Sequence, residues 1–183
     1  MCSLLRILRD YLDLARQDHL RIDFGLPFAI GSIALAALIF SKANSSSLIL
    51  EASSLTGVIV TAFTLLAGFN ATSLSIFATS NSPLAQSLKE QLIEGTDRPK
   101  IEQLLAYFSW SVVFQLILLF LSITVFFLSS FLSEESAIFQ NEIFIIVSWF
   151  IIWAGLIGIL YSIMLTMRNV SILYYYLIAD ARK

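Results

Sequence analysis

The sequence predicts an all-α protein: an integral membrane four-helix transmembrane bundle with an N-terminal amphipathic helix and cytoplasmic helix extensions. Hydrophobic residues make up 58% of the chain and charged residues only 13%, against roughly 25% charged residues in a typical soluble domain. Four long segments are almost free of charge, and each can cross a hydrocarbon core of about 30 Å. Because these segments use most of the 183 residues, we expect a single membrane domain, residues 1–183, and no separate soluble domain.

An amphipathic helix is predicted at the start of the chain, over residues 1–21. Leu4 and Leu8 share one side of this helix, whereas Arg6 and Arg9 fall largely on the other. The segment carries too much charge to span a membrane. It could lie on the membrane surface, dock a cytosolic partner or pack against its own bundle.

A helix break is expected at Gly25 and Pro27, because proline is best accepted in the first turn of a helix. Asp23 would then lie at the membrane interface, where a carboxylate favours a helix N-terminus. The four spans are predicted over residues 22–41, 55–80, 104–132 and 143–167.

The second span is the element around which the prediction is organised. It has no ionisable residue, and small or hydroxyl side chains recur along it every three or four residues, which keeps them on one helical face. This small-residue face consists of Gly57, Thr61, Thr64, Gly68, Thr72, Ser75 and Thr79. Small side chains let helices approach closely in a bilayer, so we expect a helix-packing or oligomer face. Asn70 lies on the opposite side, so one face is assigned to the chain's own bundle and the other to a neighbouring subunit.

The third span also carries polar residues close to one face, namely Ser111, Gln115, Ser122 and Ser129. This stripe should meet the second span or a symmetry mate. Asn70 and Gln115 are the intramembrane polar residues of the prediction. Each either hydrogen-bonds to neighbouring helices or lines a pore or sensing site.

The fourth span contains Gly155 and Gly158, which allow another helix to approach closely. Arg168 closes this span, and the helical pattern continues into a tail, residues 168–183.

The distribution of cations predicts the orientation in the membrane. Ten of the eleven lysine and arginine residues fall in the segments expected on one side, which the positive-inside rule assigns to the cytoplasm together with both termini. The main hydrophilic loop, residues 84–102, lies on that side and is expected to hold a short helix before a turn. Its Lys89, Arg98 and Lys100 form either a cytoplasmic partner surface or a solvated face.

No residue pattern indicates catalysis, and we expect no enzyme, cofactor or metal site. The sequence lacks a phosphate-binding glycine loop, a nucleophile elbow and HExxH. Cys2 is the only cysteine, and His19 has no second ligand at metal spacing. Cytoplasmic cations are interleaved with acids, so direct nucleic-acid binding is not expected.

Two stretches, IDFGLPFAIG at the start of the first span and TLLAGFNATSLS in the second, together with the overall layout, resemble the membrane subunit of the bacterial Kiwa anti-phage defence system. The resemblance implies a homo-oligomer, in tetrameric form, in the inner membrane. It also implies a response to phage attachment or injection and a cytosolic DNA-binding partner protein.

The resulting functional hypothesis is a non-enzymatic membrane sensor and scaffold, in which perturbation of the bilayer shifts the populations of two helix packings. One alternative is an oligomeric pore that depolarises the membrane of an infected cell. Another is a passive membrane anchor.

Overall fold

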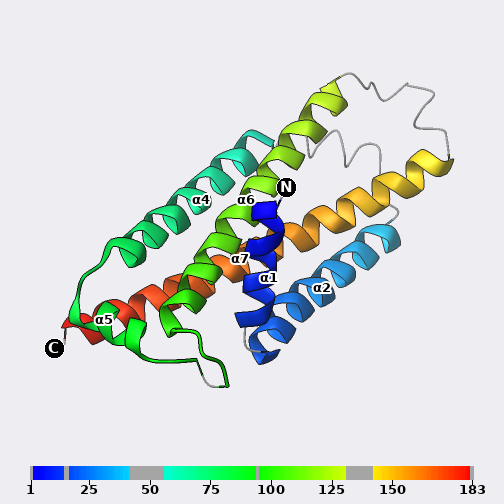
Figure 1. Ribbon diagram of the computed structural model, residues 1–183. Coiled ribbons are helices and arrows are strands. Elements are labelled where there is room, and N and C mark those ends of the chain that lie inside the picture. Colours follow the sequence, from blue (N-terminus) through cyan, green and yellow to red (C-terminus); the bar gives the residue numbers. More distant parts are fainter. Residues whose placement is uncertain (1, 15–16, 42–55, 94, 131–141, 182–183) are drawn as a thin grey trace.

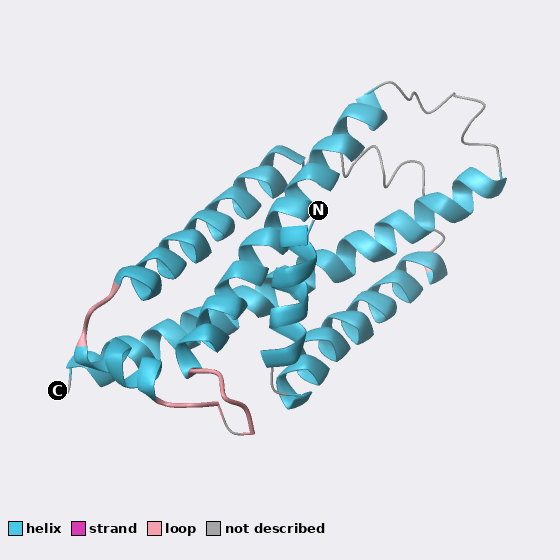
Figure 2. Cartoon of the chain, viewed as in Figure 1, coloured by secondary structure: helices cyan, strands magenta, loops and turns pink. Residues whose placement is uncertain are grey.

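The structure is a computed structural model of the chain. It describes residues 2–14, 17–41, 56–93, 95–130 and 142–181. These residues are almost entirely helical (Figures 1 and 2). The helices are α1 (Cys2–Leu14), α2 (Gln17–Phe40), α4 (Thr56–Thr79), α5 (Pro83–Glu90), α6 (Lys100–Ser130) and α7 (Glu142–Ala181). The loops expected on the far side of the membrane lie almost wholly outside the described residues.

Four helices, α2, α4, α6 and α7, are long and apolar enough to cross a membrane. Large apolar side chains on them point outward, and Ile33, Phe120 and Phe150 are 72%, 68% and 61% exposed. Soluble proteins rarely expose apolar patches of this extent. The buried positions of the same helices include many polar side chains instead, so the outer surface suits lipid rather than water.

The long helices alternate in direction and pack in the order α4, α6, α7 and α2 (Figure 1). Helix α1 lies across the first part of α6. Gly31 of α2 sits so close to α7 that an added Cβ would lie 2.7 Å from Cγ1 of Ile157. The α2 and α7 backbones are therefore in close contact at this point.

The expected break at Gly25 and Pro27 is wrong, because α2 runs continuously from Gln17 to Phe40 with Pro27 inside it. An interior proline removes one backbone hydrogen bond and its ring clashes with the carbonyl of the preceding turn, but Pro27 is buried in the packed helix, where tertiary contacts offset this cost. Asp23 is consequently not at a helix start and serves as no cap. The first helix is also shorter than expected, since α1 ends at Leu14.

The hydrophilic segment between α4 and α6 contains the short helix that its leucine spacing predicts. Helix α5 begins after Ser82, whose side chain accepts a hydrogen bond from the Ala85 N–H. A turn follows in which Gly95 has φ of 80°, a conformation that glycine adopts without strain. A single bridge between Leu92 and Pro99 closes this turn.

Helix α7 continues past Arg168 to Ala181, as the sequence pattern predicts. In this extension Tyr176 is buried against Phe77 of α4, and its hydroxyl bonds to Ser80 and Ser82. The extension thus anchors the corner between α4 and α5.

The two glycines of the fourth span differ in their surroundings. Gly158 is in close contact with Leu118 as expected, whereas Gly155 has no heavy atom near its Cβ position.

Candidate functional site

A cluster of buried polar side chains connects α4, α6 and α7. It consists of Asn70, Ser111, Gln115, Thr166 and Asn169, hereafter the polar cluster. Asn70 Nδ2 donates to Gln115 Oε1 at 3.1 Å, and Gln115 Nε2 donates to Thr166 Oγ1 at 2.8 Å. Asn169 Nδ2 donates both to Asn70 Oδ1 at 2.9 Å and to Ser111 Oγ at 2.8 Å. Each of the three helices therefore contributes at least one donor and one acceptor to these hydrogen bonds.

The polar cluster is placed by the helical repeat of each segment. Ser111 and Gln115 lie one turn apart on α6, and Ser162, Thr166 and Asn169 follow one another on one face of α7. Buried amides are costly unless they are hydrogen-bonded. These contacts consequently select one register among the helices, because sliding a helix by one turn would leave several amides unpaired.

An ion pair lies next to the polar cluster, between Asp23 of α2 and Arg168 of α7. Both side chains are largely buried, at 6% and 12% exposure. The Arg168 guanidinium carbon also lies 4.1 Å from the ring centre of Tyr107 and 5.6 Å from that of Tyr11. The aromatic faces attract the cation, so the charge of Arg168 is balanced by one carboxylate and two rings.

Tyr11 of α1 is the residue at which four helices meet. Its ring stacks on Trp110 of α6 with a centroid distance of 5.6 Å, and its hydroxyl donates to Asp23 of α2 at 3.4 Å. The Tyr161 hydroxyl of α7 donates to the same Tyr11 oxygen at 3.4 Å. Tyr11 is fully buried, so this side chain is inserted into the junction, whereas Leu4, Leu5 and Leu12 of the same helix are exposed.

The predicted polar residues of the second and third spans, Asn70 and Gln115, are thus brought together and bonded to each other. Ser111 belongs to the same cluster, and Ser122 is half-buried. The side chain of Ser129 lies outside the described set. Within the predicted stripe, Gln115 contacts Asn70 of the second span, whereas Ser111 accepts a hydrogen bond from Asn169 of α7.

The small-residue face of α4 makes no comparable contacts with the other residues that the structure describes. All seven residues, from Gly57 to Thr79, are exposed, and neither Gly57 nor Gly68 has a heavy atom within 4 Å of its Cβ position. The hydroxyls of Thr61, Thr64 and Thr72 instead donate to carbonyls of the preceding turn. The Asn70 face is therefore the one that packs in the chain's own fold.

The three residues of the predicted partner surface have different environments in the structure. Arg98 forms an ion pair with Asp10 of α1 at 3.1 Å, and the Lys100 Nζ donates to Gln91 at 3.0 Å. Lys89 is exposed on α5. Arg98 therefore also connects the turn before α6 to α1, a role that its position in a charged loop did not indicate.

Sequence reasoning missed Tyr11, Asp23, Arg168 and the α7 half of the polar cluster as site residues. A signal for Thr166 and Asn169 was present, because with Ser162 they recur at spacings of four and three in an apolar span. A signal for the ion pair was also present. Asp23 and Arg168 are opposite charges at span ends that the cation count assigns to the same side of the membrane.

The amides, hydroxyls and one ion pair of the site form contacts between helices. These contacts hold the helices together in fixed positions. Within the described ranges, no group of three or more histidine, cysteine, aspartate or glutamate side chains could hold a metal ion. The fold and the site define an all-helical protein with four helices compatible with membrane association. Comparisons with known protein families, with curated proteins and with solved structures found no match to the chain.

Proposed function

We propose that the chain is a non-enzymatic, multi-pass protein of the bacterial inner membrane that acts in anti-phage defence. In this role it senses phage attachment or membrane perturbation and serves as a scaffold for a cytosolic DNA-binding protein. The defence setting comes from the resemblance of the sequence to the Kiwa membrane subunit. The sensing role is supported by one observation, the insertion of Tyr11 of α1 between α2, α6 and α7.

Helix α1 suits a sensing element because it faces two environments. Leu4, Leu5 and Leu12 are exposed on it, as in helices that lie in a membrane interface, while Tyr11 and Leu14 are buried against the long helices. A change in the interface that moves α1 would therefore disturb the Asp23–Arg168 pair. Because α1 would contact the bilayer differently in the two helix packings, a change in the bilayer would shift the populations of these packings.

Movement of α1 would also reach the cytoplasmic turn directly. Asp10 of α1 pairs with Arg98 in the turn, and the Gln103 side chain at the start of α6 donates to the Leu14 carbonyl. Lys89 and Lys100 lie in the same segment as Arg98 and are exposed. These two lysines are the part of the segment that we assign to partner binding.

The test is co-purification of the tagged full-length chain with the product of the neighbouring gene, in intact cells and after membrane perturbation. We expect the partner to be retained by the wild type, with an amount that changes on perturbation. The double variant Lys89→Glu/Lys100→Glu should lose it. Arg21→Glu, which reverses an exposed cation on α2, is the matched control and should retain it.

Arg98→Gln separates coupling from binding, because it removes the contact with α1 but leaves both lysines in place. We expect it to bind the partner without the response to perturbation. Absence of the partner from every preparation would contradict the scaffold role. Equal amounts in all states of the wild type would contradict sensing and favour a passive anchor.

A depolarising pore remains a second candidate because of the exposed hydroxyls on α4. In an oligomer, the small-residue face could line a water path, whereas Asn70 and Gln115 are already bonded to each other. Ion flux through liposomes that contain the purified chain would test this candidate. Flux that disappears in Thr64→Val/Thr72→Val, with assembly intact, would favour the pore.

A further inference from the structure

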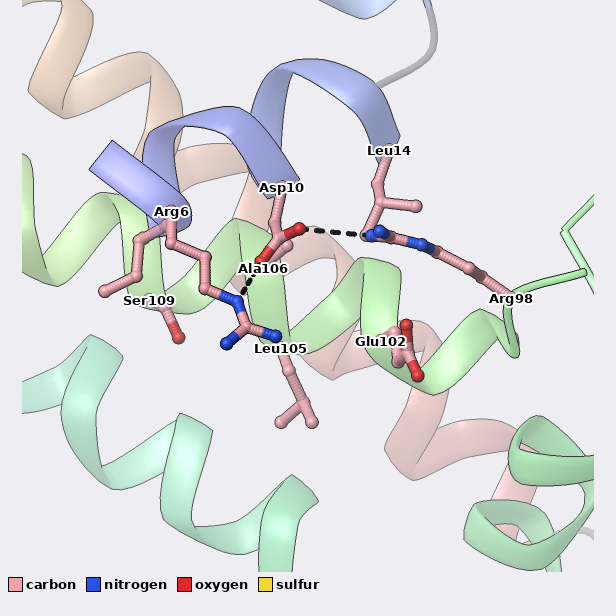
Figure 3. A pocket seen from close by; sticks show the side chains of 9 residues that line it. Arg6, Asp10, Leu14, Arg98, Glu102, Leu105, Ala106 and Ser109 are labelled. Atoms are coloured by element: carbon pink, nitrogen blue, oxygen red, sulfur yellow. Dashed lines mark hydrogen bonds and ion pairs between the residues drawn. The ribbon is translucent and has the colours of Figure 1, made fainter. Parts of the chain in front are cut away.

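A groove with a volume of about 530 Å³ lies where α1 crosses the first part of α6. Figure 3 shows Arg6 and Arg98 approaching the carboxylate of Asp10 from different sides, with Glu102 near Arg98. A second groove shares Arg6, Asp10 and Arg98 with the first and adds Arg9.

The lining of the two grooves is rich in guanidinium groups. Arg6, Arg9 and Arg98 line the grooves together with the carboxylates of Asp10 and Glu102, and Arg9 also pairs with Asp13 at 3.5 Å. Asp10 is shared, since Arg6 Nε lies 4.0 Å and Arg98 NH1 3.1 Å from its two oxygens. Each guanidinium has five N–H donors in a planar fork, so sharing one carboxylate leaves most donors of Arg6 and Arg98 for another anion.

Exposed leucines lie on the same helix as Arg6 and Arg9. Leu4, Leu5 and Leu12 are 49%, 62% and 45% exposed on the same helix, and Leu5 lines the second groove. A helix with exposed leucines beside arginines is typical of the boundary between headgroups and acyl chains. Basic grooves between helices on the cytoplasmic side are places where phospholipid headgroups bind.

We propose that Arg6, Arg9 and Arg98 form a binding site for the phosphate of an anionic phospholipid headgroup. The arginine forks match the paired oxygens of a phosphate group, and the neighbouring leucines contact the acyl chains. The inference rests on the membrane placement in the proposed function. It deepens that function, because a headgroup bound between α1 and Arg98 makes the position of α1 depend on the lipid composition.

The test measures lipids retained by the purified full-length chain in native mass spectrometry, from micelles with equal amounts of phosphatidylglycerol and phosphatidylcholine. We expect phosphatidylglycerol to be retained preferentially. Arg9→Gln should reduce the preference about fivefold, as should Arg6→Gln. Arg9 pairs with Asp13 inside α1 and is 82% exposed, so its replacement removes no contact between helices.

Matched controls remove a cation elsewhere on the side expected to be cytoplasmic, in Arg21→Gln and Lys89→Gln. Both residues are exposed, and neither lines the grooves, so both variants should keep the preference. Asp10→Asn should have the opposite effect on lipid retention. It releases Arg6 and Arg98 from the shared carboxylate and should increase retention of phosphatidylglycerol.

Three results would overturn the site: equal retention of the two lipids, an equal loss in the controls, or displacement of phosphatidylglycerol by inorganic phosphate at the same concentration. The last result would assign the arginines to free phosphate. Flotation of the chain with phosphatidylcholine vesicles, tested for resistance to alkaline extraction, separates this inference from the proposed function. A chain that inserts without preferring phosphatidylglycerol lacks the headgroup site but keeps its membrane placement.

Discussion

Arg168 of α7 forms an ion pair with Asp23 of α2, 145 residues away in the sequence, and both side chains are largely buried. Removing one partner of such a pair leaves an uncompensated charge, which costs about 3–5 kcal/mol. We therefore expect Arg168→Met and Asp23→Leu each to lower stability strongly in denaturant unfolding of the purified protein. The double variant should be more stable than either single variant, because neither charge is then left alone.

The control for the ion pair is Arg21→Met, which replaces an exposed arginine of the same helix as Asp23 and should change stability little. If Arg168→Met were no more destabilising than this control, the pair would not hold α2 against α7.

Tyr11 should decide whether α1 stays attached to the long helices. Tyr11→Ala removes a fully buried ring, and truncation of a large buried aromatic costs about 3–5 kcal/mol. We expect hydrogen exchange of the α1 amides to rise sharply while exchange in α6 and α7 changes less. Leu12→Ala, at an exposed neighbour, should leave the exchange of α1 nearly unchanged, and equal exchange in both variants would contradict the junction.

The polar cluster should show energetic coupling between α4 and α6. In a double-mutant cycle of Asn70→Leu and Gln115→Leu, we expect a coupling free energy of about 0.6 kcal/mol, with an upper range near 1.7 kcal/mol. The physical reason is the direct hydrogen bond between the two amides, 3.1 Å long. The matched cycle pairs Asn70→Leu with Thr124→Val, whose hydroxyl bonds only to its own helix; this pair should be additive.

Gly68 tests the small-residue face. Because no heavy atom lies within 4 Å of its Cβ position, Gly68→Leu should leave the monomer's stability intact and reduce self-association, measured by analytical ultracentrifugation in detergent. Ala62→Leu adds bulk at another exposed position, about 120° around the helix, and should associate normally. Unchanged association of Gly68→Leu would show that this face is not the subunit contact.

Two glycines of the long helices, Gly31 and Gly155, should respond oppositely to an added methyl group. Gly31→Ala places a Cβ 2.7 Å from Ile157 and should destabilise the protein by about 1–3 kcal/mol. Gly155→Ala meets no atom within 4 Å and should be neutral or stabilising, by up to about 1 kcal/mol, because alanine favours helix more than glycine. Thermal unfolding of the two variants provides the comparison, and equal shifts in both would contradict the close contact of α2 and α7.

The sequence by itself determined the helical class, the four apolar helices and the short helix α5. These features depend on local composition and spacing, which a single segment carries alone. It also determined that α4 has two distinct faces, because the helical repeat assigns Gly68 and Asn70 to opposite sides.

Only the tertiary structure decided which of these faces packs within the chain, and which charges meet. The break expected at Pro27 failed because packing of α2 against α7 outweighs the lost hydrogen bond and the ring clash of an interior proline, which together cost about 3 kcal/mol. Likewise, Asp23, Arg168 and Tyr11 acquire their roles from helices distant in the sequence. A pattern along one helix shows which side chains share a face, whereas the partner of that face depends on how the other helices are arranged.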